Sequence, residues 1–559
     1  MILRTRKWWK EAVCYQIYPR SFKDSNGDGI GDINGITEKL DYLKDLGIDV
    51  IWVSPIFESP NDDNGYDISD YQEIMRDFGT MEDFDRLLYE VHARGMKLIL
   101  DLVINHTSDE HSWFVEAKKS KDNEFRDWYI WKDGKDDKEP NNWASIFEGS
   151  AWEYDATTNQ YYMHVFSRKQ PDLNWENENM RQAIYNMVNW WLDKGIDGFR
   201  VDAISHIKKS FDKGDLPGAD KLGYAESFEG HMNQPGIQEY LQELKENTFD
   251  KYDIMTVGEA NGVTIEDSEE WVGEENGKFN MVFQFEHLNL WDHNVGKSFD
   301  IKGYKDVLNS WQKGLEDKGW NALFIENHDR QRVSSTWGDD EEYWYESSTS
   351  HAVVYFLQQG TPFIYQGQEI GMTNYPFEDI IDFDDVHAKN IYNQELKKGV
   401  PKEEVIEMLR RISRDNTRTP MQWDDTKNAG FTKGTPWLKV NPNFEDINVF
   451  KQEKDENSIL NFYKQLIQLK KKHLTLTYGT FDLIYPEDTK VFAYTRTYEG
   501  DQFIIIGNLS HDKVTLKKDE SLKMSDESLV LYNYQKEERS EDIFTFQPFE
   551  ARIYHIENR

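Results

Sequence analysis

The sequence is poor in the features that stabilise secreted proteins or hold proteins in membranes. It has one cysteine, Cys14, in the apolar run EAVCYQIYP, so no disulfide can form within the chain and a core position is expected. No apolar stretch approaches the roughly 18 residues that cross a bilayer. The segment MILRTRKWWKEAV lacks the apolar region of a secretory signal. We expect a cytoplasmic protein with no membrane partner.

Positive charge is also scarce. The 559 residues include 65 Lys and Arg against 103 Asp and Glu, which gives a net charge of −38. Such a surface repels phosphate backbones and anionic lipids, so no nucleic-acid partner is expected. Apolar residues make up 38% of the chain, enough for sizeable cores. A chain of this length is expected to form about two to four structural units.

Short apolar strands alternate with amphipathic segments along most of the chain. One such segment, MEDFDRLLYEVHARG, has helical periodicity, with Thr80 as its predicted N-cap and Gly95 at its end. Nearly continuous apolar strands are typical of buried parallel sheets, and eight strand–helix units favour a closed barrel over an open doubly wound sheet. The predicted strands span residues 12–19, 49–55, 96–104, 198–204, 253–260, 279–286, 321–329 and 361–371.

Three segments depart from this alternation. Residues 105–174 are rich in Trp, Asn, Asp and Gly and contain the strand-like YYMHVF, and Gly367–Thr419 forms a second irregular stretch. Near the C-terminus, TKVFAYTRTYEGDQFIIIGNLS reads as a hairpin with Glu499-Gly500 at its turn. The predicted class is α/β. It comprises a (β/α)8 TIM barrel (1–104 and 175–480), an inserted small domain after strand 3 (105–174) and a C-terminal antiparallel β-sandwich domain (481–559).

Chemically versatile side chains stand at the carboxyl ends of the predicted strands, where barrel enzymes place their active sites. They are Asp101, Asn105 and His106 after the third strand, Arg200 and Asp202 on the fourth, Glu259 on the fifth, and His328 and Asp329 on the seventh. A single carboxylate at a strand end is usually a helix cap or an ion-pair partner. The gathering of several at one mouth favours a catalytic site.

Two of these carboxylates suit glycoside hydrolysis with retention. That reaction needs a nucleophilic carboxylate and a protonated acid roughly 5–5.5 Å apart. Asp202 and Glu259 lie on neighbouring strands, and Arg200 projects to the same face as Asp202, where its charge would keep that carboxyl ionised. The sequence shows no zinc-like His/Cys spacing, no Walker-type loop and no dinucleotide fingerprint.

The segments DLVINH, QPDLNW, GFRVDAI, VGEAN and ENHD resemble the signature regions of the α-amylase superfamily of glycoside hydrolases. WWKEAVCYQIYPRSF, SPNDDNGYDISDY and RDNTRTPMQWD are similar to its α-glucosidase and oligo-1,6-glucosidase branch. The resemblance spans nearly the whole chain. It implies a (β/α)8 barrel with an inserted domain and a terminal β-sandwich, the architecture predicted above.

The resemblance also implies roles for individual residues. Asp202 would be the nucleophile, Glu259 the acid/base and Asp329 the stabiliser of the transition state. The partner would be a small oligosaccharide, bound by a monomer through a pocket that admits only a terminal sugar. Matching positions that hold the terminal glucose are Asp63, Tyr66, His106, Arg200, His328 and Arg418, and flanking pocket positions are Phe147, Phe166 and Gln170.

A stretch near the N-terminus, DSNGDGIGD, has oxygen-bearing side chains at alternate positions and a glycine at its sixth, as in the first half of an EF-hand loop. The residue at position twelve is Gly35, where a glutamate would stand in an EF-hand. Relatives of this kind bind one structural Ca²⁺ in the loop after the first strand. The resemblance implies as ligands Asp24, Asn26, Asp28, Asp32 and the carbonyl of Ile30. The alternative is an empty Asx/Gly turn.

Linkage preference is expected to depend on the residue after the nucleophile, Ala203. Members of the branch that favour α-1,6 bonds typically have valine there. The smaller alanine favours α-1,4 bonds, an effect of about 1–3 kcal/mol. Arg330 and Gln331 stand where the family usually has Gln-Pro, and His387 where glutamate is common. Arg330 would either pair with Asp339 or Asp340 or contact an unusual leaving sugar.

The expected activity is a retaining, exo-acting α-glucosidase on maltose, malto-oligosaccharides and possible further substrates such as sucrose. The alternatives are an oligo-1,6-glucosidase, a sucrose isomerase or glucosyltransferase, and a trehalose-6-phosphate hydrolase. A non-catalytic transporter subunit is disfavoured because such relatives lack the acidic triad, which Asp202, Glu259 and Asp329 supply here.

Overall fold

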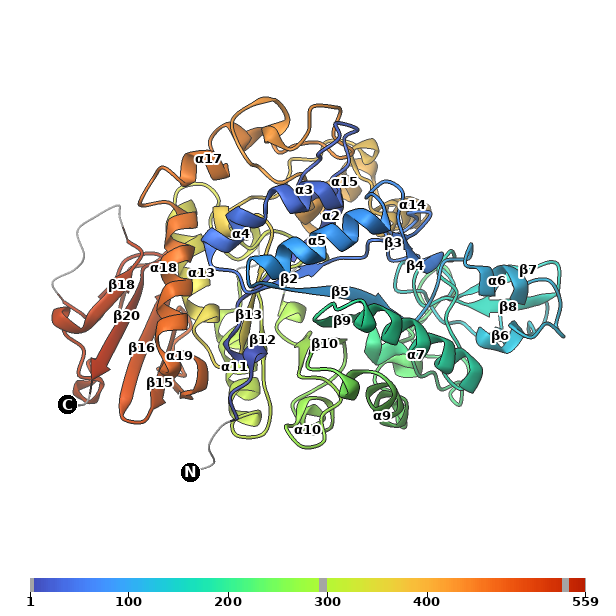
Figure 1. Ribbon diagram of the computed structural model, residues 1–559, viewed down its shortest axis with the longest axis horizontal. Helices are drawn as coiled ribbons and strands as arrows, with labels where there is room; N and C mark the ends of the chain where they lie inside the picture. The colour runs from blue at the N-terminus through green and yellow to red at the C-terminus, as the bar shows by residue number, and fades with distance from the viewer. Residues whose placement is uncertain (1–4, 291–298, 535–541, 558–559) are drawn as a thin grey trace.

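Eight parallel strands form the centre of the molecule, a computed structural model that describes residues 5–290, 299–534 and 542–557 (Figure 1). Their order in the sheet is β11-β10-β9-β5-β2-β1-β13-β12, and β11 adjoins β12, which brings the sheet round into a barrel. Each predicted apolar segment supplies one strand. The strands are β1 (Cys14–Ile17), β2 (Val50–Val53), β5 (Lys97–Val103), β9 (Gly198–Asp202), β10 (Met255–Ala260), β11 (Met281–Gln284), β12 (Ala322–Leu323) and β13 (Thr361–Tyr365).

A helix or helix pair follows each strand and covers the barrel. These are α3 (Ile33–Glu38) with α4 (Leu40–Leu46), α5 (Met81–Ala93), α7 (Glu178–Asp193), α9 (Ile237–Asn247), α10 (Ser268–Val272), α11 (Ile301–Gly314), α13 (Trp344–Phe356) and α18 (Ile459–Lys472). In α5 the predicted cap is confirmed, because the Thr80 side chain accepts a hydrogen bond from the Asp83 amide in a capping box. Gly95, with φ of 68°, follows the end of this helix. Cys14 is fully buried, as predicted.

The chain between β5 and α7 contains a small antiparallel sheet of its own, at the right-hand end of the molecule in Figure 1. It consists of β6 (Trp131–Lys132), β7 (Trp152–Asp155) and β8 (Gln160–Met163), preceded by α6 (Ser112–Ala117). A separate cluster of buried side chains, including Trp143, Met163 and Val165, packs beneath it. Leu216 and Ala225, from the chain after β9, belong to the same cluster, so the inserted segment shares this small core with a neighbouring loop.

The C-terminal sheet stands at the opposite end of the molecule (Figure 1). Its strands are β14 (Thr480–Ile484), β15 (Val491–Tyr498), β16 (Asp501–Asn508), β20 (Ala551–Glu557) and β18 (Leu529–Tyr532), with the pair β17 (Val514–Thr515) and β19 (Thr545–Phe546) packed beside it. The predicted hairpin is present, with Glu499 and Gly500 both at positive φ between β15 and β16. Alternate residues face two cores: Phe492 packs toward the barrel and Val491 toward the β17–β19 layer.

The stretch after β13 that looked irregular in sequence contains two substantial helices, α14 (Val386–Lys398) and α15 (Lys402–Ile412), followed by α16 (Asp415–Arg418). A small apolar cluster that includes Phe377, Phe383 and Leu409 holds them together. This excursion supplies part of the wall of the cavity described below. Within the described ranges, no helix combines the length and apolar character needed to cross a bilayer.

Candidate active site

The strand register brings the two predicted catalytic carboxylates together. β9 and β10 run parallel with Val201 beside Gly258, so the next residue on each strand places Asp202 beside Glu259. Neighbouring strands are separated by about 4.8 Å. Both residues lie at the carboxyl ends of their strands, where the sequence pattern predicted the site.

The buried guanidinium of Arg200 joins the acidic groups. Its Nη1 lies 2.7 Å from Asp101 Oδ1 and 2.8 Å from Asp202 Oδ1, and its Nη2 lies 2.8 Å from Glu259 Oε2. The backbone N–H of Ala203, a residue with φ of 43°, donates to the same Glu259 oxygen at 2.8 Å. Because Asp202 and Glu259 share one rigid fork, their bonded oxygens are at most about 8 Å apart.

Three carboxyl groups around a single guanidinium cannot all be ionised without leaving net negative charge in a buried site. Burial raises the pKa of Asp101 to about 6. Burial also raises the pKa of Asp202 well above its usual range, although the Arg200 charge acts to lower it. Arg200 thus acts on Asp202 in the expected direction, toward ionisation, but burial and the neighbouring acids oppose it, and Asp101 can hold a proton at moderately acidic pH.

Asp329 has the opposite electrostatic environment. Its carboxylate lies 2.9 Å from Arg418 Nη2, 3.3 Å from Arg414 Nη1 and 3.2 Å from His328 Nε2. Burial acts to raise the pKa of Asp329, but these basic groups outweigh it and hold the pKa well below the usual range. Asp329 is therefore a permanent anion at neutral pH.

A cavity of about 270 Å³ opens above these groups. Most of the predicted site residues line it: Asp63, Tyr66, His106, Phe147, Phe166, Asp202, Ala203, Glu259, Asp329 and Arg330. The remaining ones, Gln170, Arg200, His328 and Arg418, stand behind this wall and support it through hydrogen bonds, ion pairs and ring stacking. The lining also includes residues that the sequence reasoning did not select, among them Ile146, His206, Asn261, Phe285, Leu288, Asn327, Ile412 and Arg414.

Tyr66 forms a flat aromatic wall of the cavity. Its ring stacks on His328 with centroids 5.2 Å apart and planes 8° from parallel, and its hydroxyl donates to Asp101 Oδ2 at 2.9 Å. His106 Nε2 lies 3.0 Å from the Tyr66 carbonyl oxygen. Burial lowers the pKa of His106 to about 3, so the imidazole is neutral and can offer a hydrogen bond without a charge.

Arg414 ties together acidic groups from three parts of the chain. Its Nη2 lies 2.9 Å from Asp63 Oδ1, its Nη1 reaches Asp329, and its Nε lies 3.1 Å from Asp385 Oδ1. Gln170 holds the other oxygen of Asp63 at 3.1 Å. Neither Arg414 nor Asp385 was predicted, although Arg414 is the first residue of the motif RDNTRTPMQWD that carried the family resemblance.

Aromatic rings form the outer part of the cavity. Phe147 packs edge-to-face on Phe166 with centroids 5.4 Å apart, and on its other side stacks with His387 at 5.2 Å. Phe166 in turn lies 5.1 Å from His106. The inserted segment and the excursion after β13 therefore meet at the entrance.

Arg330 faces the cavity, and neither of its two expected acidic partners pairs with it. Asp339 bonds to His511 at 3.0 Å, and Asp340 accepts a hydrogen bond from Ser335. Among the described residues, no carboxylate lies within ion-pair distance of the Arg330 guanidinium. Burial lowers the pKa of Arg330, and the negative charges of Asp329 and Glu259 act to raise it. These two carboxyl groups are therefore the acids that interact with the Arg330 charge.

The loop predicted to bind calcium is folded around its own amides. Asp24 accepts backbone hydrogen bonds from Asn26 at 2.9 Å and Gly29 at 2.8 Å, and Asp32 caps α3 through the Gly35 amide. Asp24 and Asp32 are each 3% exposed. Two buried carboxylates in one short loop must have their negative charge stabilised, either by these amide donors alone or by the donors together with a cation.

The remaining predicted ligands belong to the same loop. Asn26 Oδ1 accepts from the Asp28 amide at 2.9 Å, and Asp28 Oδ1 accepts from the Ile30 amide at 2.8 Å. Within the described residues, no basic side chain forms an ion pair with Asp24, Asp28 or Asp32. The predicted donors are thus all oxygen, the type that Ca²⁺ prefers, but they accept hydrogen bonds from the loop's own amides, and ligand atoms of Asp24, Asp28 and Asp32 do not all lie within 4.8 Å of one another.

Residues 16–479 match the model of the family described as alpha amylase, catalytic domain. The chain belongs to the α-amylase family. This family member is 55% identical over 550 residues to probable oligo-1,6-glucosidase 3 of Bacillus subtilis (strain 168), covering 98% of this chain and 99% of that one. It is 53% identical over 556 residues to an oligo-1,6-glucosidase of Halalkalibacterium halodurans, covering 98% of this chain and 99% of that one.

Solved structures agree with the fold. The crystal structure of trehalose-6-phosphate hydrolase from Bacillus licheniformis superposes with a TM-score of 0.90 at 43% identity, covering 99% of this chain and all 100% of that one. That of an isomaltulose synthase from Protaminobacter rubrum gives 0.91 at 42% identity, covering 99% of each chain. The predicted resemblance and fold class are confirmed.

Proposed function

We propose that this α-amylase family member is a retaining, exo-acting α-glucosidase that releases α-glucose from the non-reducing ends of short α-glucosides such as maltose and malto-oligosaccharides. The observation that carries the proposal is the pair of carboxylates, Asp202 and Glu259, held on one buried guanidinium at the floor of the cavity. Retaining hydrolysis requires two carboxyl groups at close range. The full-length similarity to oligo-1,6-glucosidases supports the same substrate class.

The proposed reaction has two steps. Asp202 Oδ attacks the anomeric carbon while Glu259 donates a proton to the glycosidic oxygen, which releases the second sugar and leaves a covalent glucosyl-Asp202 ester. Glu259, now ionised, takes a proton from water, and the resulting hydroxide displaces Asp202 with the α configuration restored. The Ala203 amide fixes one Glu259 oxygen at 2.8 Å and so leaves the other to carry the proton.

Asp329 is proposed to stabilise the positive charge that develops on the sugar. Its depressed pKa keeps it anionic through the reaction. Asp63, held by Arg414 and Gln170, and the neutral His106 are proposed to bind hydroxyls of the terminal glucose. This concentration of hydrogen-bonding groups around a single sugar supports exo action, because an internal sugar lacks the free terminal hydroxyl they would bind.

The proposed linkage preference is α-1,4, because Ala203 leaves room beside the nucleophile. The names of the similar curated enzymes favour α-1,6 as the second candidate. The solved neighbours, a trehalose-6-phosphate hydrolase and an enzyme bound to its substrate sucrose, keep these two sugars as further candidates. The Arg330 guanidinium at the cavity would contact the leaving sugar in either case.

The activity and the linkage are tested together. Purified enzyme should hydrolyse p-nitrophenyl α-glucoside, and NMR of the first product should show the α-anomer before mutarotation. Its kcat/KM is then compared on maltose, isomaltose, sucrose and trehalose 6-phosphate. A higher value on isomaltose than on maltose would reverse the proposed linkage, and an initial β-anomer would refute the retaining mechanism.

We also propose that the loop of Asp24, Asn26, Asp28, Ile30 and Asp32 holds one structural Ca²⁺, away from the chemistry. The support is its all-oxygen donor set and its two buried carboxylates. Removal of Ca²⁺ with a chelator should lower the melting temperature of the wild type, and Ca²⁺ should restore it. Asp28→Asn should weaken this response, and an unchanged melting temperature in chelator would refute the site.

A monomeric state and a cytoplasmic location complete the proposal. The strongly negative net charge and the single, buried cysteine support them. Light scattering coupled to size-exclusion chromatography tests the first, with an expected mass near 66.2 kDa. A mass near twice that value would replace the monomer with a dimer.

A further inference from the structure

A group of potential metal ligands lies outside the cavity, at the C-terminal sheet. Within the part of the chain that the structure describes, His473, Asp501 and His555 are the one set of three such side chains whose ligand atoms all lie within 4.8 Å of one another. None of them lines the active-site cavity. We propose that this His473 cluster (His473, Asp501 and His555) binds a divalent transition metal, with Zn²⁺ as the expected ion.

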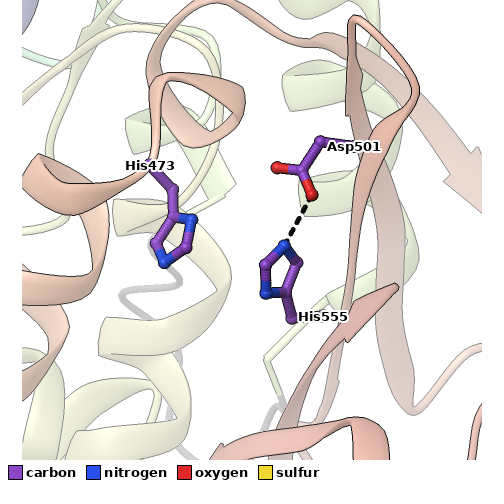
Figure 2. Close-up of side chains that lie close together, drawn as sticks. All are labelled: His473, Asp501 and His555. Carbon is purple, nitrogen blue, oxygen red and sulfur yellow. Dashed lines mark hydrogen bonds and ion pairs between the residues drawn. The ribbon is translucent and has the colours of Figure 1, made fainter. Parts of the chain in front are cut away.

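Figure 2 shows Asp501 and His555 pointing toward each other, with His473 beside them. His555 Nε2 lies 2.6 Å from Asp501 Oδ1. The His473 ring approaches the same pair from the neighbouring helix junction, with its centroid 4.8 Å from that of His555 and its plane turned by 71°. Two imidazoles at this distance and angle can direct nitrogen lone pairs to a common point beside the carboxylate.

The sheet fixes two of the three groups. β16 and β20 pair with Phe503 beside His555, and Asp501, two residues before Phe503, projects from the same face of the sheet. The Phe503 ring stacks on His555 with centroids 4.2 Å apart and planes 7° from parallel. Thr475 donates to the second carboxylate oxygen, Asp501 Oδ2, at 2.5 Å. These contacts restrict both side chains to one orientation, as contacts behind the ligands do in metal sites.

The third group comes from a different layer. His473 is the residue between α18 and α19 (Leu474–Tyr478), with extended backbone that ends the first helix. Since α18 also packs on the barrel helix α4, a metal held by all three residues would fasten the C-terminal sheet to the barrel. The proposed role is structural, with no step in glucoside hydrolysis.

The chemistry of the donors selects the ion. Two imidazoles and one carboxylate suit Zn²⁺ and its first-row neighbours, whereas Ca²⁺ and Mg²⁺ prefer sites made of oxygen. Ligands of a tetrahedral Zn²⁺ with bonds of about 2.0–2.1 Å are about 3.4 Å apart. His555 Nε2 and Asp501 Oδ1, 2.6 Å apart, must therefore separate slightly to admit the ion, while every pair in the cluster already lies within 4.8 Å. Water completes the fourth position.

The test uses untagged, full-length protein stripped with a chelator and dialysed. Calorimetric titration with ZnCl₂ should show a binding event that weakens by about 100-fold or more in His473→Gln and in Asp501→Asn, since each removes a ligand. CaCl₂ should not reproduce this event. The matched control is His511→Gln, which removes an exposed histidine that bonds to Asp339 near the same sheet but belongs to no such cluster. It should bind Zn²⁺ as the wild type does.

Two further readouts separate metal binding from folding. Saturating Zn²⁺ should raise the melting temperature of the wild type and of His511→Gln by about 2 °C, and leave His473→Gln unchanged. Co²⁺ should give the intense visible absorption of a tetrahedral site in the first two proteins only. His473 is half-buried, so its glutamine variant should fold even where changes at His555 do not. Zn²⁺ binding of equal stoichiometry and affinity in wild type and His473→Gln would overturn the proposal, whatever the glucosidase activity.

Discussion

The floor and the entrance of the cavity are built differently. On the floor, Arg200 bonds to three carboxyl groups within 2.8 Å, and every group is fixed by the register of barrel strands. At the entrance, Phe147 and His387 meet through ring stacking, and Arg330 has no ion-pair partner among the described residues. The side chains of the floor are therefore held in one arrangement, which suits the proposed attack on the anomeric carbon. The entrance consists of packed aromatic rings and a guanidinium without an ion pair in the described part of the chain, and we expect it to influence which departing sugar is accepted.

This difference predicts how mutations will behave. Changes on the floor should lower the rate on every substrate, because the proposed mechanism uses each group there in the transition state. Changes at the entrance should alter the ratio of rates between substrates, because they act on the departing sugar.

The largest effect is expected for Asp202→Asn. Loss of the nucleophile should lower kcat on p-nitrophenyl α-glucoside by about 10⁴- to 10⁶-fold. The circular dichroism spectrum and melting temperature should stay close to those of the wild type, because the amide can still accept from Arg200. Equal glucose release by the variant and the wild type would show that the nucleophile is another residue.

The next largest effect is expected for Glu259→Gln. General acid catalysis contributes about 10²–10⁴-fold, and substrates with good leaving groups need it least. The loss on maltose should therefore exceed the loss of the first step on p-nitrophenyl α-glucoside, measured as a nitrophenol burst. Identical losses in the two measurements would contradict the acid role.

Arg414→Gln should give an intermediate loss. It frees Asp63, Asp329 and Asp385 from one shared cation, so kcat/KM on maltose should fall by about 100-fold with most of the change in KM. Arg411→Gln, close by in sequence and paired only loosely with Glu407, is the control and should stay near wild type. A large loss in both variants would point to general destabilisation of the α14–α15 excursion.

Variants of Ala203 and Arg330, which line the cavity where the departing sugar is proposed to lie, should have smaller effects and change selectivity. Ala203→Val should raise the ratio of kcat/KM on isomaltose to that on maltose by about 10-fold. The added methyl groups should crowd the departing sugar of an α-1,4-linked substrate more than that of an α-1,6-linked one. Its melting temperature is measured alongside, since a β-branched side chain at positive φ is strained.

Arg330→Gln should change the same ratio of kcat/KM values while leaving p-nitrophenyl α-glucoside hydrolysis within about threefold of wild type. A uniform loss on all substrates would place either residue functionally on the floor.

The smallest effect concerns pH. The proposed nucleophile, Asp202, must be ionised to attack. Because its pKa is raised, kcat/KM should decline as pH falls through that raised value rather than near the usual 3.8. Asp101→Asn removes a neighbouring negative charge and should move this acid limb down by about 0.5–1 pH unit. Asp109→Asn, outside the cavity, is the control. If the acid limb of Asp101→Asn moved to higher pH or did not move, the Asp101 charge would not be one of the causes of the raised Asp202 pKa.

Sequence reasoning identified the floor because barrel strands place their last residues at one mouth. Asp202, Glu259 and Asp329 could be found from strand ends and motifs alone. The protonation of these groups could not be predicted, because the rise in the pKa of Asp202 comes from burial and then from the charges of Glu259 and Asp101, which a linear pattern does not display.

Long-range contacts account for the rest of what was missed. Arg414 meets Asp63 across 351 positions of the chain, through an excursion that looked irregular in sequence. The His473 cluster likewise draws on a helix junction and two strands, so no short motif marks it. Residues that act through neighbours far along the chain become visible only in the folded structure.

The most direct test of the central claim is covalent trapping. A fluorinated glucosyl fluoride that slows the second step should leave one sugar on the enzyme. Peptide mass spectrometry should then locate it on Asp202, with no labelling of Asp202→Asn. A label on any other side chain, or turnover with no trapped ester at any concentration, would contradict the double-displacement mechanism at this site.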